Sequence, residues 1–147
     1  MIAATAALSA APVSVASPNC DRISLSGQTQ LNFATGRIEG MLTGTLGGDP
    51  ISIFSSTQIL GQEQRGAVSF ITTSHAFTVV GGEHDGEQLT TLDNARLVPT
   101  PTPGVFRAVS NLDVVSGGSG FLVAVGTLDF RGGITATWNR IHGQICE

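Results

Sequence analysis

Charged side chains inside the strand-like stretches of this sequence are its first candidates for chemistry. Only 12% of the residues are charged, about half of the usual ~25%. Residues two apart in an extended segment face the same side, so Arg37 and Glu39 share a face, as do Arg107 and Asp113. A charge that faces an apolar interior must be paired or functional, because its burial is otherwise costly. The charged residues placed in this way are Arg37, Glu39, Asp93, Arg96, Arg107, Asp113, Asp129 and Arg140.

Three of these residues are predicted as catalytic candidates: Glu39, Asp113 and Arg107. A carboxyl group whose pKa is raised by apolar surroundings can protonate a substrate, and a guanidinium can hold a carboxylate or enolate. The alternative for each of the three is a place on a solvated outer face or rim.

Aromatic and apolar residues near the middle of the same stretches are predicted to contact a ligand. They are His75, Trp138, Phe70, Phe106 and Leu112. Of the remaining histidines, His84 lies at an expected hairpin tip, and neither it nor His142 forms an H-x-H or H-E-x-x-H spacing, so we predict three independent histidines and no metal site.

Several other kinds of chemistry find no support. The seven basic residues are all Arg, which removes Schiff-base and P-loop lysine chemistry. The glycine cluster at 117–120 is not followed by a helical pattern, so neither a nucleophile elbow nor a phosphate cradle is predicted. A formal net charge of −4 offers no basic surface for nucleic acid. We predict no cofactor.

The elements that must position these residues are eight extended segments separated by Gly, Pro, Asn and Asp. They cover residues 22–33, 37–46, 51–59, 67–79, 88–98, 105–115, 121–130 and 134–145. Short connections rich in glycine are typical of hairpins. The pattern predicts an all-β fold with little helix: a closed eight-stranded antiparallel up-and-down β-barrel, which can hold one small ligand.

The two faces of these segments are hard to tell apart. In 105–115 the face that carries Phe106 and Leu112 is the more apolar, whereas in 67–79 neither face is. In 134–145 a strict alternation places Arg140 and His142 on the face of Trp138. Residues 99–104, with three prolines, are predicted to form a stiff extended connector.

Both cysteines stand at the ends of the predicted barrel, which spans residues 20–147 as one domain. The start of the first strand and the end of the eighth lie side by side in such a barrel, so Cys20 and Cys146 are predicted to form a disulfide; the alternative is two unpaired thiols. Residues 1–16 are apolar and end in Ser14-Val15-Ala16, like a signal peptide without its basic region. We therefore predict a secreted or periplasmic protein.

An outer-membrane barrel is disfavoured, because such barrels carry aromatic girdles and this chain has one Trp and no Tyr. We predict no membrane span. The low charge favours an outer face that is partly covered by another subunit, and so a homo-oligomer, dimer or trimer.

The chain from about Arg22 to its end, read as an eight-stranded barrel of this length, resembles the allene oxide cyclase and dirigent-like barrel superfamily, in particular its small exported bacterial members. The resemblance rests on Gly118-Ser119-Gly120-Phe121, on Gly126-Thr127-Leu128, and on the run from Ile141 to Cys146. These motifs encode turns and close backbone contacts. No catalytic residue is carried over, because the chain has no Tyr and its carboxylates do not align with the glutamate of the plant cyclases.

The resemblance implies a cofactor-free isomerase or cyclase that holds a small, largely apolar molecule in the barrel lumen. Whether the protein is an enzyme is left open. The alternatives are a non-catalytic carrier or scavenger with the same kind of lumen, and a structural surface protein that oligomerises. An acid paired with Arg in the interior would favour the enzyme. A wholly apolar lumen would favour the carrier, and a lumen filled by side chains would favour the structural protein.

Overall fold

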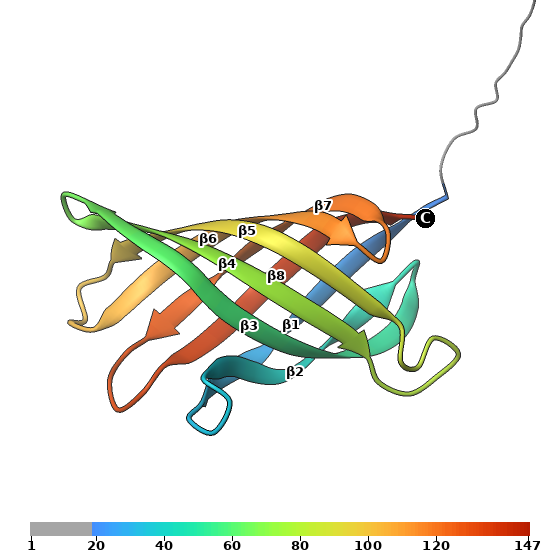
Figure 1. The fold of residues 1–147 in the computed structure, drawn as a ribbon, viewed down its shortest axis with the longest axis horizontal. Helices are drawn as coiled ribbons and strands as arrows, with labels where there is room; N and C mark the ends of the chain where they lie inside the picture. Colours follow the sequence, from blue (N-terminus) through green and yellow to red (C-terminus); the bar gives the residue numbers. More distant parts are fainter. Residues whose placement is uncertain (1–18) are drawn as a thin grey trace, which may run out of the picture.

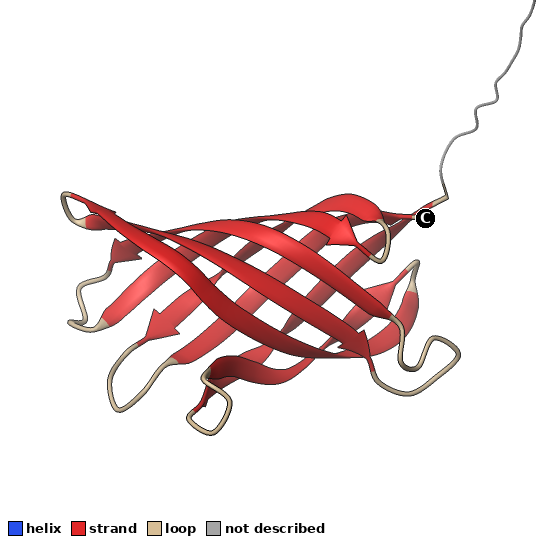
Figure 2. Cartoon of the chain, viewed as in Figure 1, coloured by secondary structure: helices blue, strands red, loops and turns tan. Residues whose placement is uncertain are grey.

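The computed structural model describes residues 19–147, so the predicted leader at 1–16 lies outside the described residues. Eight strands follow one another with no helix between them (Figures 1 and 2). Among the residues described, none forms a helix long and apolar enough to span a membrane. The strands are β1 (Cys20–Asn32), β2 (Arg37–Leu46), β3 (Asp49–Arg65), β4 (Val68–Val79), β5 (Gln88–Pro99), β6 (Val105–Ser116), β7 (Ser119–Asp129) and β8 (Thr135–Cys146).

The strands close into a barrel in chain order. Each strand pairs antiparallel with the next, and β8 pairs antiparallel with β1, so the sheet has no free edge. The predicted fold class is confirmed. One end of the barrel carries the termini of the described chain and the β2–β3, β4–β5 and β6–β7 connections; we call it the disulfide end, and the opposite one the far end. The β3–β4 hairpin lies at the far end (Figure 1).

Alternation along the strands decides which side chains enter the barrel. In β4, Ser69, Ile71, Thr73, His75 and Phe77 are buried, and the residues between them are half-buried on the outside. Neither face of β4 is more apolar in sequence, because its interior includes Ser, Thr and His. In β6 the interior face carries Ala108, Ser110 and Leu112, as the sequence predicts.

A bulge in β8 corrects the predicted face of that strand. Gly27 pairs with Trp138 and Leu25 with Ile141, which leaves one extra residue in β8; the pairing with β7 shifts at the same place. Trp138 and Ile141 are therefore both buried. Arg140 is exposed instead of sharing the face of Trp138, and His142, next to buried Ile141, also lies on the outer side.

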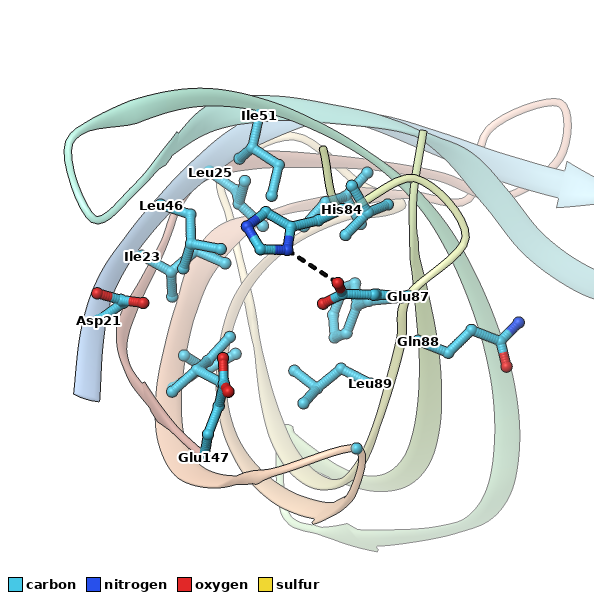
Figure 3. A pocket seen from close by; sticks show the side chains of 16 residues that line it. Asp21, Ile23, Leu25, Leu46, Ile51, His84, Glu87, Gln88, Leu89 and Glu147 are labelled. Atoms are coloured by element: carbon cyan, nitrogen blue, oxygen red, sulfur yellow. Dashed lines mark hydrogen bonds and ion pairs between the residues drawn. The ribbon is translucent and has the colours of Figure 1, made fainter. Parts of the chain in front are cut away.

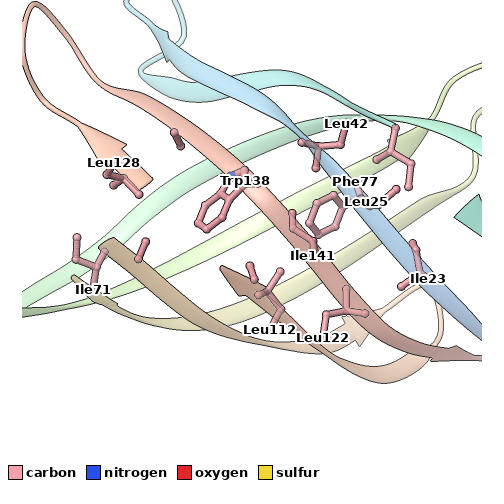
Figure 4. Close-up of a cluster of buried hydrophobic side chains, with 14 of the residues drawn as sticks. Ile23, Leu25, Leu42, Ile71, Phe77, Leu112, Leu122, Leu128, Trp138 and Ile141 are labelled. Carbon is pink, nitrogen blue, oxygen red and sulfur yellow. The ribbon is translucent and has the colours of Figure 1, made fainter. Parts of the chain in front are cut away.

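The centre of the barrel is filled by side chains. Leu42, Leu112, Leu122 and Ile141 are each at most 1% exposed, and Phe77 and Trp138 pack with them (Figure 4). An eight-stranded barrel is just wide enough for this. Open space is consequently confined to the two ends.

The seam between the first and last strands is cross-linked. Cys20 pairs directly with Cys146 in the β1–β8 register, their Cα atoms are 4.0 Å apart, and a disulfide joins them. The predicted disulfide is thus present, and among residues 19–147 there is no free cysteine.

The connector after β5 differs from the prediction. Thr100 N–H donates to Val105 O (3.1 Å), and Val105 N–H donates to Thr102 O (3.1 Å). These bonds fold residues 100–104 into a compact turn rather than an extended polyproline segment, because the Thr residues between the prolines bond back to the chain.

Candidate functional site

A cavity of about 550 Å³ opens at the disulfide end of the barrel, and we call it the mouth cavity. Its walls are apolar side chains from most of the strands (Figure 3). They include Ile23, Leu25, Leu46, Ile51, Phe77 and Leu89. The same alternation that fills the centre of the barrel points these residues inward.

The rim of the mouth cavity is polar and mostly acidic. Asp21, Glu87 and Glu147 stand around the opening with His84 and Gln88 (Figure 3). His84 Nδ1 and Glu87 Oε2 are 2.8 Å apart. This hydrogen bond and the charge of Glu87 raise the pKa of His84, and the neighbouring Glu83 and Glu147 carboxylates act in the same direction.

Residues 80–87, the β4–β5 connection, bring His84 and Glu87 to this rim. Gly81 N–H donates to Asp85 Oδ1 (2.6 Å), and Gly86 N–H donates to Val79 O (2.8 Å). Gly81 and Gly82 have φ values of 78° and 74°, which glycine adopts without strain. The loop therefore has a defined shape beside the opening.

A second, much smaller space of about 40 Å³ lies toward the far end, and we call it the pit. Its walls include Ile38, Ile71, Leu128 and Trp138, and Thr29, Thr57, Thr73, His75 and Ser110 also line it, mostly through their carbon atoms. The packed centre of the barrel lies between the pit and the mouth cavity, and no residue lines both spaces.

A buried polar network adjoins the pit. His75 Nδ1 shares a short hydrogen bond with Asp93 Oδ2, and Thr73 Oγ1 donates to the same oxygen (3.0 Å). Asp93 is fully buried, and its Oδ1 has no hydrogen-bond partner among the described residues. The His75 ring stacks on Phe77, with ring centroids 5.2 Å apart. The interior thus contains an acid and a base in contact.

The three catalytic candidates do not meet in the interior, which corrects their expected position. Glu39 lies on the outer side between buried Ile38 and half-buried Gly40, where Asn32 Nδ2 donates to its Oε1 (2.9 Å). Arg107 and Asp113 are exposed on the outer face of β6, since the residues that alternate with them fill the core. Each of the three therefore lies on the solvated outer face, which is the alternative to an interior catalytic position.

The predicted ligand contacts divide into three groups. His75 and Trp138 line the pit. Leu112 belongs to the packed centre, and Phe106 packs against the core and meets Phe130 edge to face at 5.5 Å. Phe70 points outward under the Arg65 guanidinium, 4.9 Å from its ring centre, which corrects its expected place in the lumen.

Sequence reasoning missed the mouth cavity and the partner of His75. Asp93 is visible in sequence as an acid on the strand face that also carries Leu89, Ala95 and Leu97. An acid on an apolar face, facing a histidine on the next strand, is the signal that identifies this pair. The described residues contain no group of three or more His, Cys, Asp or Glu side chains placed to hold a metal ion.

Comparisons of the chain with protein-family models, with curated proteins and with solved structures give no match. The function is therefore argued from the geometry of the two spaces alone.

Proposed function

We propose that this protein binds a small, largely apolar molecule in the mouth cavity. The observation that carries the proposal is an open space of about 550 Å³ with apolar walls and a polar rim, at the end of an otherwise filled barrel. Ligand sites are typically clefts of ~300–1,000 Å³ with mainly apolar walls and a few polar groups.

The polarity of the cavity fits a ligand whose apolar body lies inside and whose polar end faces water. Burial of ~200 Å² of apolar ligand surface contributes about 5 kcal/mol before the entropy of association is subtracted. Asp21, Glu87 and Gln88 at the rim supply hydrogen-bond acceptors and a donor for the polar end.

A cofactor-free isomerase or cyclase is the second candidate. It is favoured by the His84–Glu87 pair, which places a base and an acid within hydrogen-bond distance at the edge of the mouth cavity. A positioned imidazole or carboxyl group can move a proton on a bound substrate. Glu39, Arg107 and Asp113 have no part in this candidate, because they lie on the outer face.

Secretion and self-association belong to the same proposal. The Cys20–Cys146 disulfide supports an extracellular or periplasmic location, since disulfides persist in oxidising compartments.

Apolar side chains exposed on the outer side of β6 and β7 (Val115 at 58%, Phe121 at 49%, Val125 at 36%) support a homodimer or homotrimer. Light scattering coupled to size-exclusion chromatography tests the oligomer.

Two substitutions on one strand test the mouth cavity. Leu89 lines the cavity, whereas Leu92 on the same strand is 45% exposed on the outside. Leu89→Gln places an amide where the ligand would desolvate it, so we expect about tenfold weaker binding of the neutral dye N-phenyl-1-naphthylamine. Leu92→Gln is the matched control and should bind the dye like the unchanged protein. Equal affinity for all three proteins would refute the proposal.

Native mass spectrometry of protein purified from its own host identifies the natural ligand. A retained molecule that is displaced by the dye supports binding in the mouth cavity. For the catalytic candidate, His84→Gln and Glu87→Gln are then assayed with that molecule. Loss of turnover with retained binding supports an enzyme, and unchanged turnover removes His84 and Glu87 from it.

A further inference from the structure

The charged groups around the opening of the mouth cavity are almost all acidic. Asp21, Glu87 and Glu147 line the cavity and stand around its opening (Figure 3). The only basic side chain among its lining residues is His84, so three carboxylates face at most one imidazolium. The opening therefore carries a net negative charge at neutral pH in either protonation state of the His84 ring.

The arginines of the protein are placed elsewhere. None of the seven lines the mouth cavity. Arg22 is exposed on the outer face of β1, because its neighbours Asp21 and Ile23 take the inward-facing positions. Five others lie in the strand halves nearer the far end or in a connection there: Arg37, Arg65, Arg96, Arg107 and Arg131. No guanidinium therefore neutralises the carboxylates inside the opening.

Two of the three carboxylates also lack a partner in the protein. The ion pairs found within residues 19–147 include neither Asp21 nor Glu147, whereas Glu87 shares its hydrogen bond with His84. Hydrogen bonds from a cationic donor to a carboxylate are among the stronger ones in proteins. An apolar cavity edged by such carboxylates can therefore bind a cation that is attached to an apolar body.

The carboxylates surround the opening and do not converge on one point. Within residues 19–147, no three His, Cys, Asp or Glu side chains are placed to hold a metal ion. A groove that adjoins the opening continues the acidic rim, since Asp49 and Glu83 line it together with Asp21 and no arginine does. This arrangement suits an organic cation, whose charge is spread over several atoms.

We propose that the ligand of the mouth cavity is a cationic amphiphile with an alkyl tail and an ammonium head, a proposal that rests on the function inferred above. The tail lies between apolar walls that include Leu25 and Phe77, and the head lies among Asp21, Glu87 and Glu147. An ammonium group is attracted by each of these carboxylates, whereas an anionic head is repelled by all three. Salt should weaken this preference, because the head lies at the open end, where ions screen it.

Three octyl compounds with the same tail and different heads test the preference. Each is titrated into the protein loaded with N-phenyl-1-naphthylamine, and release of the dye measures its affinity. We expect octyltrimethylammonium to release the dye at concentrations about tenfold lower than octanoate, with 1-octanol between the two. Raising NaCl from about 20 mM to about 500 mM should bring the cation and the anion closer together.

Two double variants with the same change in net charge locate the effect. Asp21→Asn with Glu147→Gln removes two carboxylates from the opening and leaves the hydrogen-bonded pair at the rim intact. It should weaken octyltrimethylammonium binding about tenfold and 1-octanol binding less than about twofold. Glu39→Gln with Asp113→Asn removes two carboxylates from the outer face and should bind all three compounds like the unchanged protein.

The results distinguish a wrong ligand class from a wrong binding site. If the dye binds Leu89→Gln as tightly as the unchanged protein, the mouth cavity is not the binding site and both proposals fail. The cationic ligand alone is overturned if the dye occupies the mouth cavity but no octyl compound releases it, or if 1-octanol or octanoate releases it as readily as octyltrimethylammonium does. It is also overturned if the two double variants have equal affinity for octyltrimethylammonium.

Discussion

His75 on β4 and Asp93 on β5 share a hydrogen bond inside the barrel, where their side chains are only 6% and 0% exposed. Thr73 donates to the same carboxylate oxygen, so three polar groups from two adjacent strands meet in an apolar core, and of the two carboxylate oxygens only Asp93 Oδ1 has no partner in the described residues. Such a network specifies which strand faces point inward, because an alternative register would bury these groups without partners.

Asp93→Ala is expected to destabilise the protein strongly. The substitution leaves His75 Nδ1 and Thr73 Oγ1 buried without their acceptor. Loss of one partner of a buried pair costs about 3–5 kcal/mol in unfolding free energy, which denaturant titration followed by circular dichroism measures. Asp113→Ala removes an exposed carboxylate instead and should change the free energy by less than ~0.5 kcal/mol.

Replacement of both partners tests whether this loss comes from the unpaired groups. The double variant His75→Leu, Asp93→Leu removes both members of the pair and leaves only Thr73 Oγ1 without its acceptor, so it should be clearly more stable than Asp93→Ala. A double variant as unstable as Asp93→Ala would mean that packing, and not the hydrogen bond, makes these positions important.

The disulfide is expected to add to stability through the unfolded chain. Cys20 and Cys146 are 126 residues apart, so their bond restricts a long loop. Cys20→Ser with Cys146→Ser should lower the unfolding free energy by about 2–4 kcal/mol. The unchanged protein under reducing conditions should lose the same amount. A reduced protein as stable as the oxidised one would contradict this account.

Protonation of His84 is expected to depend mainly on Glu87. The pKa of His84 is raised from 6.5, chiefly by its hydrogen bond to Glu87 and less by Glu83. The contribution of the pair to stability is therefore present below pH 6.5 and is lost as the pH rises through the raised pKa. NMR titration of the His84 ring should show a larger fall in pKa for Glu87→Gln than for Glu83→Gln; falls of equal size would assign the effect to general charge.

The barrel was predictable from sequence because Gly, Pro, Asn and Asp mark its turns. The length of the chain and the positions of its two cysteines also fit a closed barrel. The expected segment 37–46 coincides with β2, and 105–115 differs from β6 by one residue. The inward-facing side of each strand was harder to predict, since β4 places Ser, Thr and His inside the barrel. The prediction that Arg140 shares the face of Trp138 was wrong, because a bulge adds one residue to β8 and a periodic pattern does not reveal a bulge.

The candidate sites were less predictable, because a sequence pattern does not show where a closed barrel leaves open space. Leu89 and Ile51 look like ordinary core residues in sequence, and only closure of the barrel shows that the space between them is empty. The prediction that His75 and Trp138 contact a ligand is not tested by the structure, which places both at the pit. Arg107 and Asp113 have the chemistry of catalytic residues, but they lie on the less apolar face of their strand, which is the exposed one.

Gly126 is expected to be required by its cross-strand partner Trp138. A Cβ atom at Gly126 would lie 2.8 Å from Trp138 Cε3 and 2.2 Å from Thr137 O, so one strand must move to admit it. Gly126→Ala should therefore reduce the unfolding free energy by about 1–3 kcal/mol and shift the Trp138 emission. Gly61→Ala is the control, because nothing lies within 4 Å of a Cβ there. If Gly126→Ala matches Gly61→Ala in both stability and emission, close contact between β7 and Trp138 is not what fixes the indole beside the pit.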